Sequence, residues 1–346
     1  MIRHHRLTTA VLALLLPAIG ACGNQGTTQP KTSDLLSQQS ADRVAIENII
    51  QTSADFDVAF TDDGGELLAQ APSAVSAASG AQSAQMDSTA TLPVHWGRWR
   101  IPPDQPPTRT VDFLMPPDSG RVLVKINVKY DGWFFVDRTD DGVRNPGKKL
   151  LQDKKTRYAL FKKIWFHEDG ASTDSVFGWR LIALSPGEFT MIDPARQSVH
   201  ISKVELTGEH SHVTITDPAA LLPLGRTPNL LPFFRSGETV KVEASVTNTD
   251  TGFDPATYVF LHVPIADQAF PNPRQWQRLL MLDDGTHGDA TAGDGVFTAM
   301  WTVSNVGRHH VAVDVLNARI LQNETDDDYN STAWGVPYGS YPSLLP

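Results

Sequence analysis

The spacing of hydrophobic residues changes along the chain from a helical period to alternation. Between Asp34 and Phe60, apolar residues recur mainly at three- and four-residue steps, which predicts an amphipathic helix. From Trp96 onward apolar and polar residues alternate, as they do in strands. The segment Arg121–Val136 alternates on both sides of Asp131-Gly132, a pattern typical of two strands joined by a turn. A leading helix followed by antiparallel strands is an α+β pattern.

The same alternation predicts further strands up to the C-terminal end. They are Arg157–Phe166, Trp179–Leu184, Val199–Leu206, His212–Ile215, Thr239–Thr247, Thr257–Val263, Gly295–Val303 and His309–Val315. The proline-containing segment 221–231 is predicted as a linker. It would separate an α+β domain over residues 34–220 from an all-β domain over residues 232–346, whose strand spacing is that of a β-sandwich.

The first residues have the order of a secretory signal peptide. Basic residues are followed by an apolar run over 10–16, which is too short to span a bilayer, and then by small residues. Ile19-Gly20-Ala21-Cys22 resembles the bacterial lipobox. The resemblance implies cleavage before Cys22, so that residues 1–21 are removed and lipid is attached to the Cys22 sulfur. Two or three acyl chains on that residue give stable membrane anchoring.

An ordinary signal peptide with Cys22 as a bystander is the alternative reading of this region. In the lipobox reading, the polar residues 22–33 form a flexible tether. The position after the cysteine is Gly23, and not the aspartate that retains many lipoproteins in the inner membrane. Placement in the cell envelope at the outer membrane is therefore favoured over the inner membrane.

Charge and cysteine content exclude several classes of partner and fold. The formal net charge is −10 at pH 7, and an acidic surface repels nucleic acid and anionic lipid alike. We therefore expect no nucleic-acid partner, and membrane attachment only through lipid on Cys22. Because Cys22 is the only cysteine, the chain has no internal disulfide and no cluster of thiolate metal ligands.

The middle of the chain resembles the SnoaL-like or nuclear-transport-factor-like cone fold. The resemblance lies in Asp42-Arg43-Val44-Ala45-Ile46 and in Gly178-Trp179-Arg180-Leu181. It implies a helix plus a curved antiparallel sheet around a pocket, although no catalytic acid–base pair can be assigned here. Tyr130, Trp133 and Trp179 are the candidates for an aromatic pocket lining. The same three residues also suit a core or a sheet face.

The C-terminal part resembles the immunoglobulin-like domain of bacterial surface proteins of the choice-of-anchor X type. The resemblance lies in the acidic, glycine-rich segment Leu282–Thr298 between two predicted strands. It implies a presentation or adhesion module, for which an envelope protein or a glycan is the expected kind of partner.

The same acidic segment is the candidate metal site. Asp283, Asp284, Asp289 and Asp294 could supply oxygen ligands to Ca²⁺, and the intervening glycines permit tight curvature. The spacing is not that of an EF-hand. The alternative, which we favour, is that these aspartates form Asx turns and fold the loop without a cation.

Two functional hypotheses follow from the sequence. The first is a membrane-anchored envelope lipoprotein that acts as a non-enzymatic binding or scaffolding protein. The alternative is a small-molecule binding protein or enzyme that uses a pocket in the cone-like domain. No serine-hydrolase, zinc-protease or phosphate-loop motif occurs in the sequence, and we favour a role without catalysis.

Overall fold

The computed structural model describes most of the chain from residue 32 to residue 342. The described residues are 32–56, 61–63, 68–69, 95–102, 104, 106–115, 120–139, 141, 143–167, 175–224, 231–250, 252, 255–265, 276–304 and 306–342. Cys22, the predicted signal peptide and all but the last two residues of the predicted tether lie outside them. The chain divides into the units Met1–Gln38 and Gln39–Pro346, and every described strand belongs to the second unit.

One α-helix, short 3-10 turns and many strands make up the described secondary structure. The elements are α1 Thr32–Thr52, η1 Ala54–Phe56, β1 Leu68–Ala69, β2 His95–Trp99, β3 Thr108–Phe113, β4 Arg121–Asp137, β5 Gly147–His167, β6 Ser175–Leu184, β7 Gly187–Met191, η4 Pro194–Arg196, β8 Val199–Thr207, β9 His212–Ile215, β10 Leu222–Pro223, β11 Phe233–Arg235, β12 Thr239–Asn248, β13 Thr257–Pro264, β14 Trp276–Met281, β15 Val296–Thr302, β16 Gly307–Asn317, η5 Ala318–Leu321 and β17 Ser331–Tyr341. The fold is thus mainly antiparallel β with one helix.

The predicted strands fall on observed ones, but the prediction was incomplete. No predicted strand covers β3, β7, β14 or β17, and α1 ends at Thr52, short of the predicted Phe60. Each of the separately predicted strands from Arg157 onward lies within an observed strand or extends one residue beyond it. The predicted turn at Asp131-Gly132 is wrong, because β4 runs without interruption through both residues. A glycine occurs at position 132 because the strands pack closely there. A Cβ on Gly132 would lie 2.2 Å from the carbonyl oxygen of Trp99. Gly132 is needed for the approach of β2, and the chain does not reverse there.

The described strands form two sheets. The larger has the order β1-β2-β4-β5-β7-β17-β16-β13-β14, with β3 beside β4, β6 beside β5, β10 beside β6 and β11 beside β17. The smaller has the order β15-β12-β8-β9. All pairs are antiparallel except β11 with β17. Pairing of β7 with β17 and of β8 with β12 joins strands from both sides of residues 221–231, so the predicted linker separates no sheet.

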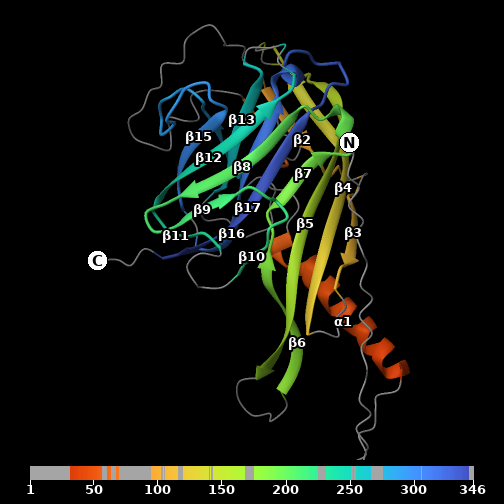
Figure 1. The fold of residues 1–346 in the computed structure, drawn as a ribbon. Helices are drawn as coiled ribbons and strands as arrows, with labels where there is room; N and C mark the ends of the chain where they lie inside the picture. The colour runs from red at the N-terminus through yellow and green to blue at the C-terminus, as the bar shows by residue number, and fades with distance from the viewer. Residues whose placement is uncertain are drawn as a thin grey trace, which may run out of the picture. The chain divides into compact units, whose positions relative to one another are not determined.

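Strands β13, β16 and β17 are buried on both faces. Side chains from one face pack against the smaller sheet in a core that contains Val242 of β12 and Val313 of β16. Side chains from the other face pack against the N-terminal strands of the same curled sheet, in a core that contains Trp96 of β2 and Ala312 of β16. Figure 1 shows β8, β9 and β12 side by side, and the long strands β4, β5 and β6 that continue the large sheet.

Helix α1 contributes to the second of these cores. Ile46 and Ile50, four residues apart and therefore on one helix face, are buried there. Asp42 on the same helix accepts hydrogen bonds from Trp179 Nε1 at 2.9 Å and from Lys163 Nζ at 3.1 Å. These contacts fix residues 39–52 against β5 and β6. Among the described residues, no helix has the length and hydropathy that crossing a membrane requires.

Candidate functional site

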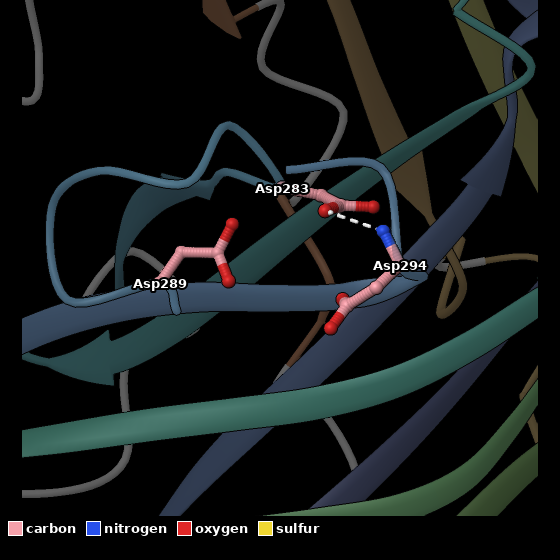
Figure 2. Close-up of side chains that lie close together, drawn as sticks. All are labelled: Asp283, Asp289 and Asp294. Atoms are coloured by element: carbon pink, nitrogen blue, oxygen red, sulfur yellow. Dashed lines mark hydrogen bonds between the residues drawn. The ribbon is translucent and has the colours of Figure 1, made fainter. Parts of the chain in front are cut away.

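The acidic loop between β14 and β15 brings three predicted metal ligands together. One carboxylate oxygen each from Asp283, Asp289 and Asp294 lie within 4.8 Å of one another, as Figure 2 shows for the three side chains. The four glycines of the loop all have positive φ, which allows the predicted tight curvature. Carboxylate oxygens at this separation could share one hard cation such as Ca²⁺.

Main-chain amides of the loop already bind the same carboxylates. Asp283 accepts hydrogen bonds from the N–H groups of residues 293–295 at 2.6–3.2 Å. Asp289 accepts two such bonds and Asp294 accepts one, at 2.7–3.3 Å. These bonds account for the conformation of the loop without a cation, as in Asx turns. Calcium binding stays a prediction.

Asp284, the fourth predicted ligand, stands apart from the three converging carboxylates. Its carboxylate accepts a hydrogen bond from Thr286 N at 2.8 Å and lies 3.1 Å from His287 Nδ1. Partial burial acts to raise the pKa of Asp284, but the hydrogen bonds from Thr286 and His287 outweigh it and lower that pKa. Asp284 therefore shapes the turn beside the cluster.

The three predicted pocket aromatics do not share a pocket. Tyr130 and Trp133 are an odd number of positions apart on β4, so their side chains lie on opposite faces of the sheet. Tyr130 is fully buried and packs against Phe189, with ring centroids 5.8 Å apart. Trp133 is partly exposed on the outer face, where Lys148 Nζ lies 5.8 Å from its ring. Of the three, Trp179 lines the cavity described next, and Tyr130 and Trp133 do not.

That cavity is a groove at the junction of the two sheets, with a volume of about 1090 Å³. It is lined by the end of α1, by η1, and by segments of β6, β9, β11, β16 and β17. We call it the groove. The lining residues used below are Ile49, Ser53, Asp55, Trp179, Arg180, His210, Ser211, His212, Val213, Leu231, Phe233, Arg308 and Tyr341.

The carboxylate of Asp55 in the groove is already engaged. Arg308 Nη2 lies 3.0 Å from Asp55 Oδ2, and Ser53 Oγ donates a hydrogen bond to the same oxygen at 3.0 Å. Behind it, Arg157 Nη1 donates a hydrogen bond to the main-chain oxygen of Asp55 at 2.6 Å. Asp55 is therefore held in place from its backbone and from its side chain.

A buried histidine, His310, contacts the arginine that binds the main chain of Asp55. His310 Nε2 lies 3.0 Å from Arg157 Nη1, so the histidine is placed to accept a hydrogen bond from the guanidinium. Burial holds the pKa of His310 well below its usual range, and the charges of Arg157 and Lys155 lower it further. The imidazole is therefore neutral at neutral pH.

Two further ion pairs lie in the interior of the large sheet, away from the groove. Asp314 on β16 binds Arg98 on β2 and lies 3.0 Å from His262 Nε2. Burial acts to raise the pKa of Asp314, yet Arg98 and His262 lower it overall. Arg98 and Asp314 have no exposed side-chain area, so a ligand from solvent cannot reach them. Their role is structural.

The second interior pair is held by a tyrosine as well as by an arginine. Arg100 Nη2 lies 2.7 Å from Asp153 Oδ2, and the Tyr329 hydroxyl donates a hydrogen bond to the same oxygen at 2.8 Å. Burial and the charge of Asp153 both raise the pKa of Tyr329. The hydroxyl therefore stays protonated and serves as a donor.

Comparisons with protein-family models, with curated proteins and with solved structures gave no match to this chain. The functional conclusion therefore depends on the geometry of the groove and of the acidic loop.

Sequence reasoning missed most of the groove. Phe233, Arg308 and Tyr341 come from separate strands, and no local motif links them. A signal did exist for the interior ion pair, because Asp314 stands alone in the apolar run Val311–Leu316. A single acid in a strand buried on both faces requires a buried partner.

Proposed function

We propose that this chain is an envelope lipoprotein, anchored through lipid on Cys22, that binds a ligand in the groove and catalyses no reaction. The observation that carries the binding role is the groove itself. Its volume of about 1090 Å³ is just above the usual range of about 300–1,000 Å³ for small-molecule sites, and its lining combines aromatic and aliphatic surface with many polar groups. A lining of this kind can hold a ligand that has both an apolar and a polar part.

The state of Asp55 favours binding over acid–base catalysis. A general acid or base must be free to exchange a proton with the substrate. Asp55 is the only carboxylate among the described lining residues, and Arg308 and Ser53 occupy one of its oxygens. Because Arg308 and Ser53 hold that oxygen in internal contacts, catalysis of proton transfer by Asp55 is the less favoured alternative.

The proposal places the protein in the cell envelope, with the outer membrane favoured over the inner. The lipobox-like residues before Cys22 support this placement, and the net charge of −10 makes electrostatic docking on anionic lipid unfavourable. The acidic charge also argues against a nucleic-acid partner. An envelope protein or a glycan is the proposed partner of the C-terminal region.

The finer fold assignment is part of the same proposal. A cone-like arrangement is supported by residues 39–52 of α1 packing on the long antiparallel strands β5 and β6. An immunoglobulin-like sandwich is supported by the core between β8 and β12 of the small sheet and β13, β16 and β17 of the large one. The resemblance to choice-of-anchor X domains is proposed for residues 232–346 of this region.

The anchor is tested by labelling. The full chain is expressed in a lipoprotein-processing bacterium supplied with an alkyne analogue of palmitate. We expect label in the wild-type chain and recovery in the membrane fraction, and neither for Cys22→Ser. Because Cys22 is the only cysteine, thioester labelling elsewhere cannot mimic the result. Equal membrane recovery of both forms, without label, would overturn the anchor.

The groove is tested by filling it. The chain carrying Cys22→Ser is purified, and binding of anilinonaphthalene sulfonate is followed by fluorescence. Val213→Trp adds bulk on β9 inside the groove and is expected to weaken binding at least about tenfold, which corresponds to about 1.4 kcal/mol. The matched control is Val143→Trp, because Val143 is 59% exposed and outside the groove. Equal binding by both variants, or no binding by the wild type, would refute the groove as the ligand site.

A further inference from the structure

We infer that the groove takes an amphipathic organic anion, with an apolar body and a single carboxylate or sulfonate. This inference rests on the proposed binding role of the groove and adds the chemical class of its ligand. It depends on three features of the lining: apolar surface, an excess of cationic side chains, and hydrogen-bond donors that the protein itself leaves available.

The apolar part of the ligand would contact the floor of the groove. Trp179 and Leu231 are almost fully buried there, and Phe233 and Ile49 are partly exposed. The Trp179 indole nitrogen is already bound to Asp42 at 2.9 Å, so its ring offers apolar contact and no free donor. Burying a hydrocarbon against such surface yields about 25 cal/mol per Å².

Cationic side chains outnumber anionic ones in the lining. Arg180 and Arg308 are opposed only by Asp55, although the whole chain has a formal net charge of −10. Three further carboxylates, Asp42, Glu205 and Glu209, contact lining residues without lining the groove themselves, and Asp42 lies 2.9 Å from Trp179 Nε1. Glu205 and Glu209 lie 3.4 Å from His212 and 3.5 Å from His210, respectively. The cationic excess is thus confined to the lining itself, where Arg180 and Arg308 favour an anionic head group.

Donors in the groove remain available after the hydrogen bonds among the described residues are counted. Arg308 is 49% exposed and uses Nη2 on Asp55, which leaves other N–H groups of its guanidinium. The Tyr341 hydroxyl accepts a hydrogen bond from Arg235 Nε at 3.2 Å, so its own proton can be donated to a ligand. Ser211 Oγ likewise accepts from Phe233 N at 3.2 Å. These donors fit a head group made only of acceptors.

The test compares three ligands that share one apolar chain. Laurate, lauryl alcohol and laurylamine compete with anilinonaphthalene sulfonate for the chain carrying Cys22→Ser, each below its micelle concentration. We expect laurate to bind about tenfold more tightly than the alcohol, and the amine more weakly than both. A charge-assisted hydrogen bond is worth enough to account for a factor of this size.

Two substitutions at one ion pair give opposite expected effects. Arg308→Gln removes the cation and leaves Asp55 unpaired, so laurate affinity should fall about tenfold while affinity for the alcohol changes little. Asp55→Asn frees Arg308 and should preserve or increase laurate affinity. The matched control is Arg319→Gln, because Arg319 is 54% exposed and lies outside the groove. A merely structural role of the pair would shift all ligands in one direction for both variants.

The outcomes separate this inference from the proposed function. If laurate, alcohol and amine bind equally and Val213→Trp abolishes all three, the groove binds a ligand but the anion preference is refuted. If no ligand binds, both fail. Retention by phosphatidylglycerol vesicles without binding of free laurate would also overturn the assignment, because the ligand would then be a membrane surface.

Discussion

The two faces of β16 bury different kinds of side chain: apolar ones on one face, and an ion-paired aspartate among apolar ones on the other. Val311, Val313 and Val315 point toward the small sheet, into a core made of aliphatic and aromatic side chains. The alternate residues point into the curled large sheet, and Asp314 there meets Arg98. One strand therefore separates an apolar core from an apolar core that also contains a buried ion pair.

This contrast indicates what each interior contributes. Burial of apolar area stabilises the fold roughly in proportion to that area, and substitutions of similar volume are tolerated. A buried ion pair contributes little net stability, yet loss of one partner leaves an uncompensated charge in the interior. We therefore expect neighbouring positions on β16 to differ strongly in their sensitivity to substitution.

The largest effect is expected at Asp314. Replacement by alanine leaves the Arg98 guanidinium buried without its carboxylate, and should lower the free energy of unfolding by about 4 kcal/mol. Urea denaturation followed by tryptophan fluorescence measures this change. A loss below about 1 kcal/mol would contradict a structural ion pair.

A double substitution keeps this prediction testable if the single variant does not fold. Arg98→Met combined with Asp314→Leu removes both charges and retains volume. We expect the double variant to recover at least half of the stability that Asp314→Ala loses, because no unpaired charge remains. A double variant as unstable as the single one would show that the apolar volume, and not the charge, decides the effect.

The adjacent apolar position should respond less. Val313→Ala removes buried hydrocarbon next to the small sheet and should cost about 2 kcal/mol, measured by the same denaturation. Val313→Ile, which keeps the apolar character, should cost less than Val313→Ala. If Val313→Ala and Asp314→Ala lowered the free energy of unfolding equally, the two faces of β16 would not differ in their sensitivity to substitution.

Acid should weaken the charged interior through His310. Its pKa is lowered in the folded state, mainly by burial, so the unfolded chain binds a proton that the folded chain does not. Stability is then fully present above about pH 6.5, the unfolded pKa of histidine, and falls below it by at most about 1.4 kcal/mol per pH unit. Denaturation midpoints between pH 7 and pH 5 measure this slope.

A histidine substitution assigns the slope to that residue. His310→Leu should flatten the pH dependence between pH 7 and pH 5, whatever its effect on stability at pH 7. His200→Leu is the control, because His200 is an exposed histidine on β8. A slope that survives in His310→Leu would show that another group takes up the proton.

The smallest effect is expected at the acidic loop. The carboxylates of Asp283, Asp289 and Asp294 already accept main-chain hydrogen bonds, so millimolar Ca²⁺ should change the melting midpoint by less than about 1 °C relative to a chelator. A rise of several degrees, lost in Asp289→Asn, would instead establish a calcium site. The measurement thus decides between the two readings of the loop.

Local pattern located strands where one period dominates, but it indicated no strand at β3, β7, β14 or β17. The segments 239–247 and 257–263 lie within β12 and β13, with alternation or continuous burial as expected. Pattern failed at Gly132, because a glycine needed for close packing of β2 looks like a turn residue. The acidic loop was recognised from its spacing, and three of its four aspartates do converge.

The arrangement of strands could not be predicted, because it depends on contacts between distant segments. Nothing in β7 indicates that it pairs with β17, and nothing in Arg98 indicates that its partner is Asp314. The groove was hidden for the same reason, since its walls come from seven elements. Trp179 was predicted as a pocket residue from its sequence motif, and it does line the groove.

The pairing of β17 with β7 also has a consequence for the order of folding. Strand β17 lies in the middle of the large sheet, between β7 and β16, although it is the last strand described. The two parts of that sheet cannot be joined until the chain has been made as far as residues 333–335, which pair with β7. Such long-range closure is slow, and the exposed edges of β7 and β16 are open to wrong partners until it occurs. We therefore expect chains truncated before Ser331 to aggregate, and not to fold in part.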